Sequence, residues 1–96
     1  MLEIRPTCEN CKTKLAPDSN DARICSFECT YCQSCAEDVF KNVCPNCGGG
    51  FVPRPIRPKK MLMKYPASNV VVEKPLDVAA FEALCKDMIN IHPSKR

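Results

Sequence analysis

The sequence predicts a small metal-stabilised α+β protein: a cysteine module with little regular structure, a basic proline-rich arm and a C-terminal amphipathic helix. Three observations support this fold class. Nine of the 96 residues are Cys, and four Phe, two Tyr and no Trp leave little material for an apolar core. Eight of the cysteines form four pairs in the first half, and apolar residues recur at helical spacing near the C-terminus. A chain this short needs a further source of stability besides hydrophobic burial, here called a staple, such as a bound metal ion or disulfide bonds.

Zinc is the expected staple. The N-terminal segment Met1-Leu2-Glu3-Ile4-Arg5-Pro6 has no apolar run typical of a signal peptide, and no stretch of about 18 apolar residues can span a membrane. We therefore expect a cytoplasmic protein whose thiols stay reduced. One zinc with spare thiols and a disulfide framework are the alternatives, although an odd number of cysteines leaves at least one unpaired.

The spacing of the cysteines favours two zinc sites. The four pairs are Cys8 and Cys11, Cys25 and Cys29, Cys32 and Cys35, and Cys44 and Cys47. A CxxC turn places two thiolates on one side of the backbone, suited to one tetrahedral ion with Zn–S of about 2.3 Å. Four pairs complete two Cys₄ sites, which leave no coordination position for water or substrate. The metal is therefore expected to be structural, and the protein not to be an enzyme. Four-thiolate sites accept iron as well as zinc.

From Cys8 to Cys47 the chain resembles the RING finger, with Cys29 where that family usually has His. The resemblance implies a cross-brace, in which the first and third pairs hold one Zn²⁺ and the second and fourth pairs hold the other. The implied ligand sets are Cys8, Cys11, Cys32 and Cys35 for site one, and Cys25, Cys29, Cys44 and Cys47 for site two. It also implies a short helix over residues 36–41, with Val39 and Phe40 packed inward. Two consecutive sites, like zinc ribbons in series, are the alternative, because spacing alone does not distinguish the two arrangements.

The chain also resembles a bacterial family of short proteins known only as a domain of unknown function. The resemblance covers about residues 1–57. It rests on Leu2-Glu3-Ile4-Arg5-Pro6, on Ala22-Arg23-Ile24-Cys25-Ser26-Phe27-Glu28-Cys29-Thr30, and on Cys44-Pro45-Asn46-Cys47-Gly48-Gly49. It implies no activity, so function has to be inferred from the residues.

The chain divides into three predicted segments. Residues 1–52 form the cysteine module, residues 53–66 a basic proline-rich linker, and residues 67–96 a short strand plus the amphipathic helix. Residues 53–60 alternate Pro with basic side chains, which favours an extended, solvated segment. The runs Met61-Leu62-Met63 and Val70-Val71-Val72 are expected to be short strands on either side of a turn at 66–69.

Residues 77–92 are predicted to be a helix that begins at the N-cap Asp77 and stops before Pro93. Its apolar stripe consists of Val78, Phe81, Leu84, Cys85, Met88, Ile89 and His92. One isolated helix cannot bury such a stripe, so it must pack on the cysteine module, on the short strands or on a second copy of the chain. A homodimer through this helix is therefore possible. Cys85, the ninth cysteine, is expected to pack as a small hydrophobic residue.

By elimination of chemistry, we expect a non-enzymatic structural-zinc protein that acts as an adaptor for an unknown protein partner, with no membrane contact. Nucleic-acid binding through the basic arm is the alternative. Its phosphate ligands would be Arg54, Arg57, Lys59, Lys60 and Lys64.

Two further alternatives are a ubiquitin-ligase-like function and a redox-responsive dithiol. The RING resemblance implies the first, but Glu9 and Asn10 stand between the first two cysteines, where ligases have a large aliphatic residue. Gly48 also follows the last cysteine, where ligases commonly have Arg or Lys. A thioredoxin-like dithiol needs a βαβ context, which the sequence pattern lacks.

Overall fold

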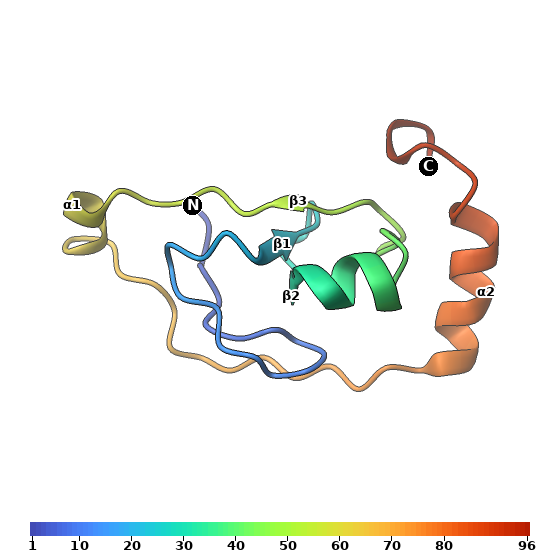
Figure 1. Ribbon diagram of the computed structural model, residues 1–96, viewed down its shortest axis with the longest axis horizontal. Coiled ribbons are helices and arrows are strands. Elements are labelled where there is room, and N and C mark those ends of the chain that lie inside the picture. Colours follow the sequence, from blue (N-terminus) through green and yellow to red (C-terminus); the bar gives the residue numbers. More distant parts are fainter.

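A small antiparallel sheet lies at the centre of the molecule (Figure 1). The computed structural model describes residues 1–96, and its strands are β1 (Ala22–Ile24), β2 (Thr30–Cys32) and β3 (Val52–Pro53). Their order is β2-β1-β3, and Arg23 is paired with Tyr31 on one side and with Pro53 on the other. The hairpin from β1 to β2 therefore carries the second cysteine pair in its loop and ends on Cys32, the start of the third pair.

A short helical segment, η1 (Cys35–Val39), follows β2 where a helix over residues 36–41 is predicted. It is a π-helical turn in which the Phe40 amide donates to the Cys35 carbonyl at 2.9 Å. Phe40 is buried as expected, but the expected inward packing of Val39 is wrong, because its side chain is 47% exposed. Adjacent residues on a helix point roughly 100° apart, so both side chains cannot face the same narrow core.

The hydrophobic core is small and rich in sulfur. Of its 13 buried residues, six are cysteines of the paired set. Four aromatic rings make three edge-to-face contacts in the rest of the core. The centroid of the Tyr31 ring lies 4.8 Å from that of Phe40 and 5.4 Å from that of Phe51. The centroids of Phe40 and Phe81 are 5.3 Å apart. A core with this composition gains little from hydrocarbon burial alone, which agrees with the expectation of a metal staple.

The arm after β3 is fastened to the N-terminal segment by its two arginines. Arg54 is only 5% exposed, and its guanidinium donates to the carbonyls of Arg5, Leu15 and Ala16 at 2.8, 3.5 and 3.0 Å. Arg57 donates to the carbonyls of Leu2 and Tyr65, each at 2.7 Å. The proline and basic residues predict a solvated segment, whereas the structure uses both arginines as internal donors.

The two predicted strands in residues 61–72 are absent. Lys59–Leu62 form the short helix α1 after Pro58, so Met61 and Leu62 are helical, and residues 70–72 have no regular structure. Neither run finds a strand partner, and an unpaired strand leaves its backbone groups without a ladder. Figure 1 shows the segment between α1 and α2 running along one edge of the molecule. The whole molecule measures 42 × 26 × 19 Å.

Replacing Arg54 with Met is expected to lower the free energy of unfolding by about 3 kcal/mol, because three carbonyls would lose a charged donor in a place that water does not reach. Chemical denaturation of the metal-loaded chain measures this change. Lys59→Met is the control, since Lys59 is exposed, and its effect should stay within about 0.5 kcal/mol. Equal effects of the two substitutions would show that the Arg54 bonds contribute no stability.

The C-terminal helix α2 (Val78–Met88) begins as predicted. The Asp77 side chain accepts a hydrogen bond from the Ala80 amide at 3.0 Å, but the helix ends at Met88, four residues before the expected end at residue 92. A 3₁₀ turn, η2 (Pro93–Lys95), follows.

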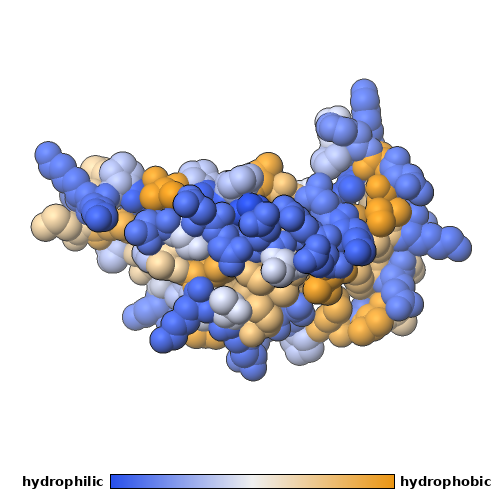
Figure 2. Space-filling view, viewed as in Figure 1, coloured by the Kyte–Doolittle hydropathy of each residue, from blue (hydrophilic) through white to orange (hydrophobic).

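In the structure the apolar stripe of α2 packs on the cysteine module, one of the three surfaces considered. Phe81 is buried against the core, with Leu84, Cys85 and Met88 partly buried beside it. Val78 and Ile89 stay exposed, and Figure 2 shows hydrophobic side chains at the surface around this end of the molecule. No helix in the chain has the length and apolar content needed to cross a membrane.

Candidate metal centres

The first group of thiols combines the first and third cysteine pairs. The Sγ atoms of Cys8, Cys11, Cys32 and Cys35 all lie within 4.8 Å of one another. Four sulfurs around a tetrahedral zinc at about 2.3 Å would be about 3.8 Å apart, and the Cys11 and Cys32 sulfurs are 3.7 Å apart. Cys11 is exposed and the other three are buried. The spacing of this group therefore fits one tetrahedral ion.

The second group combines Cys25 of the second pair with both cysteines of the fourth pair. The Sγ atoms of Cys25, Cys44 and Cys47 lie within 4.8 Å of one another. Cys29 is buried, and its thiol shifts the pKa values of Cys25 and Cys44. Its Sγ atom is not among those that all lie within 4.8 Å of one another. The structure thus gathers seven of the eight predicted ligands into two groups and places Cys29 at the margin of the second.

Two backbone turns of the same geometry supply one pair to each group. In the Cys8–Cys11 turn the amide of Lys12 donates to the Cys8 carbonyl at 3.0 Å, and in the Cys44–Cys47 turn the amide of Gly48 donates to the Cys44 carbonyl at 2.8 Å. Lys12 and Gly48 both adopt left-handed backbone conformations, with φ of 65° and 78°. The glycine makes the second turn easy to form, because it carries no Cβ to oppose this conformation.

Each turn also places an asparagine against a sulfur. Asn10 donates its side-chain amide to Cys35 Sγ at 3.3 Å, and Asn46 donates to Cys29 Sγ at 3.5 Å. Both asparagines directly precede the second cysteine of their turn. Donors that point at sulfur stabilise the thiolate form and orient the ligand. The sequence analysis missed these two residues, although the repeated Cys-x-Asn-Cys pattern was the signal that could have found them.

Backbone amides point at sulfur in the same way. The donors are the N–H groups of Cys11, Phe27 and Gly49, which donate to Cys8, Cys25 and Cys47 at 3.5, 3.4 and 3.4 Å. These contacts give both groups the outer shell that thiolate ligands usually have.

The pKa values of two thiols in the second group are shifted in opposite directions. Hydrogen bonds from the Cys29 and Cys44 thiols lower the pKa of Cys25 to about 3. The reciprocal contacts with Cys25 and Cys29, together with burial, raise the pKa of Cys44. Burial likewise raises the pKa of Cys35 in the first group. A divalent cation would neutralise the charge that such groups cannot hold alone, and all nine cysteines are free of disulfides. The donor sets therefore fit a thiophilic metal such as Zn²⁺ or iron.

The metal-free chain is expected to react with iodoacetamide at Cys11 first. The Thr13 hydroxyl, 3.0 Å from Cys11 Sγ, lowers the pKa of this exposed thiol to about 6. The thiolate, which is the nucleophile, is therefore dominant above pH 6 and is lost as the pH falls through 6. Peptide mapping at a series of pH values should give a labelling midpoint near 6, and Thr13→Val should move it upward. An unchanged midpoint in the variant would contradict the role of Thr13, and bound metal should block the reaction in both.

Residues 1–57 match the family model described as "Protein of unknown function (DUF1272)". The matched region contains all eight paired cysteines and both asparagines. An uncharacterized protein of Rhizobium meliloti (strain 1021) is 59% identical over 75 residues, which cover 78% of this chain and 89% of the relative. No solved structure matches the chain. These matches confirm the bacterial family expected from the sequence, and the chain belongs to the DUF1272 family of proteins of unknown function.

Proposed function

We propose that the protein is a non-enzymatic zinc protein, in which two closed Cys₄ sites crossed as in the RING finger stabilise a small protein-interaction module. The observation that carries this proposal is the grouping of the thiols. The first pair lies with the third, and Cys25 of the second pair lies with the fourth, so each group joins cysteines that are not adjacent in the sequence order of the pairs. Serial zinc ribbons would group adjacent pairs instead.

The proposed ligands of site two include Cys29. It is 1% exposed, shifts the pKa values of Cys25 and Cys44, and accepts a hydrogen bond from Asn46. A small side-chain movement on metal binding would complete the tetrahedron. With four protein ligands in each site, neither metal would have a position for substrate, which favours a structural role over catalysis.

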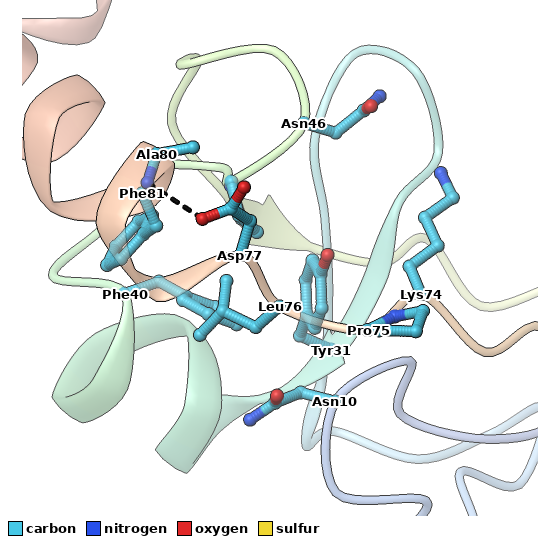
Figure 3. Close-up of a pocket in the computed structure, with 11 residues that line it drawn as sticks. Asn10, Tyr31, Phe40, Asn46, Lys74, Pro75, Leu76, Asp77, Ala80 and Phe81 are labelled. Atoms are coloured by element: carbon cyan, nitrogen blue, oxygen red, sulfur yellow. Dashed lines mark hydrogen bonds between the residues drawn. The ribbon is translucent and has the colours of Figure 1, made fainter.

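A cavity between the two metal turns supports the interaction role. It has a volume of about 190 Å³ and lies between Asn10 of one turn and Pro45 and Asn46 of the other. Figure 3 shows Tyr31, Phe40 and Phe81 on its apolar side. Apolar walls with a few convergent polar groups are typical of binding sites, and this one is large enough for a side chain of a partner. The nucleic-acid alternative has weaker support, since Arg54 and Arg57 already bind backbone carbonyls.

Metal analysis combined with thiol titration tests the proposal at the level of the sites. Protein purified without added metal should contain two zinc ions per chain and one freely titrating thiol, Cys85. Less than one metal per chain with oxidised cysteines would refute the zinc scaffold and favour redox chemistry.

A photo-crosslinking amino acid tests the interaction role. It would be placed at Pro45, beside the cavity, or at Lys60 on the arm, and adducts would be compared in cells. Protein adducts from position 45 but not from position 60 would support the interaction module. Nuclease-sensitive adducts from position 60 alone would favour the nucleic-acid alternative.

A further inference from the structure

The C-terminal residues 74–96, here called the strap, fold around the second thiol group. Phe81 packs edge to face on Phe40 with centroids 5.3 Å apart. Leu84 approaches Gly48 so closely that a Cβ there would lie 3.3 Å from its Cδ1 atom. At the far end, Arg96 donates to the carbonyls of Asn42 and Gly48 at 2.8 and 3.1 Å. The strap therefore contacts both flanks of the Cys44–Cys47 turn.

Lys74, the first residue of the strap, lies between two buried side chains, Cys29 and Glu9. Its Nζ atom is 3.8 Å from Cys29 Sγ and 3.8 Å from Glu9 Oε1. The Glu9 side chain is 0% exposed, and its Oε1 atom accepts no hydrogen bond. The other oxygen, Oε2, accepts from Arg5 and from the Thr30 amide. Lys74 thus contacts both the carboxylate oxygen that accepts no hydrogen bond and the marginal ligand of site two.

A bound metal would set the charge that faces Lys74. A zinc ion held by four thiolates would carry a net charge of −2, and the Lys74 ammonium group, 3.8 Å from Cys29 Sγ, would stabilise it. Without the metal this −2 centre does not form, and Lys74 loses part of the attraction that holds the strap there. The Lys74 side chain is 45% exposed, so solvent partly screens this attraction. The attraction still acts at short range, because Nζ contacts the sulfur of Cys29, a proposed metal ligand.

The helix of the strap buries little of its surface. Phe81 is the only buried residue among the eleven of α2. An element with so little burial opens locally at low cost, and a small change at its anchor shifts that equilibrium.

We propose that Lys74 latches the strap to site two, so that metal binding at this site and docking of the strap stabilise each other. This inference rests on the proposed two-site function. Reciprocity follows from linkage: a docked strap slows the loss of metal, and loss of metal releases the strap. Release would uncover Phe40, on which Phe81 packs, and would remove the wall of the cavity that strap residues such as Leu76 and Phe81 form (Figure 3). The matched family region ends at residue 57, so the strap lies outside it.

The test compares Lys74→Met with Lys95→Met in the full metal-loaded chain. Lys95 is a matched control, because it is an exposed lysine of the same strap whose side chain contacts neither a thiol nor Glu9. A chelator is added with N-ethylmaleimide, and peptide mapping follows which cysteines become labelled as metal leaves. Hydrogen exchange of residues 78–88 reports docking of the strap.

Lys74→Met should speed labelling of Cys25, Cys29, Cys44 and Cys47 by about tenfold or more, the effect usual for an outer-shell residue of a metal site. Labelling of the first group should change less than about twofold, and exchange in 78–88 should rise. Lys74→Arg should retain the wild-type behaviour, and Lys95→Met should stay close to it.

Equal rates and equal exchange in Lys74→Met and Lys95→Met, with two metals bound in each, would overturn the latch while leaving the two-site proposal intact. A wild-type chain that binds no metal at site two would instead refute the proposed function.

Discussion

Replacing Cys44 with Ser is expected to remove the metal from site two and to leave the chain without a stable fold. Cys44 is 0% exposed and lies in a core where six of 13 residues are cysteines. A structural zinc contributes about 10 kcal/mol or more to folding, which is as much as the whole stability of many small domains. Native mass spectrometry gives the metal count, and the dispersion of amide signals in a proton–nitrogen NMR spectrum reports the fold.

Cys85→Ser is the matched control for this change, because Cys85 is half-buried on α2 and belongs to neither thiol group. It should keep two metals and lose at most about 1 kcal/mol of stability. A Cys44→Ser chain that binds two metals and unfolds with the same midpoint as Cys85→Ser would contradict the assignment of Cys44 as a ligand.

Replacing Phe40 with Ala should lower the free energy of unfolding by about 4 kcal/mol, within the range found for buried Phe→Ala changes. Phe40 is 1% exposed, and its ring joins Tyr31 of the sheet to Phe81 of α2. Its loss would leave a cavity and remove the main contact between the cysteine module and the strap. Denaturation must be followed at a fixed excess of zinc, because bound metal itself shifts the apparent stability.

Phe27→Ala is the control for the Phe40 substitution. Phe27 lies in the loop between β1 and β2 and is 67% exposed, so its removal should change stability by no more than about 0.5 kcal/mol. If both substitutions cost the same, the aromatic contacts around Phe40 are not a main source of stability.

The sequence predicted the features that depend on local spacing. Cysteine pairs at CxxC spacing form metal-binding turns through their own backbone geometry, so the two thiol groups could be expected. The N-cap Asp77 and the Phe81 stripe also follow from local rules, and both are present in α2. The surface on which α2 packs could not be predicted, because an apolar stripe shows that a helix face is buried but not which part of the protein covers it.

Features set by contacts between distant residues were not predicted. Arg54 was expected among phosphate ligands, but carbonyls 38 to 49 residues away bind it inside the protein. Val39 was assigned to the core because it is apolar, and only the orientation of η1 shows that it faces outward. The contact of Lys74 with Cys29 spans 45 residues, and no pattern in the sequence indicates it.

The most direct test of the central claim is a proton–cadmium correlation NMR spectrum of the chain loaded with ¹¹³Cd, which links each ion to the β protons of its own cysteines. We predict one ion coupled to Cys8, Cys11, Cys32 and Cys35, and a second coupled to Cys25, Cys29, Cys44 and Cys47. An ion coupled to the first and second pairs together, or a second ion without a coupling to Cys29, would contradict the two crossed Cys₄ sites.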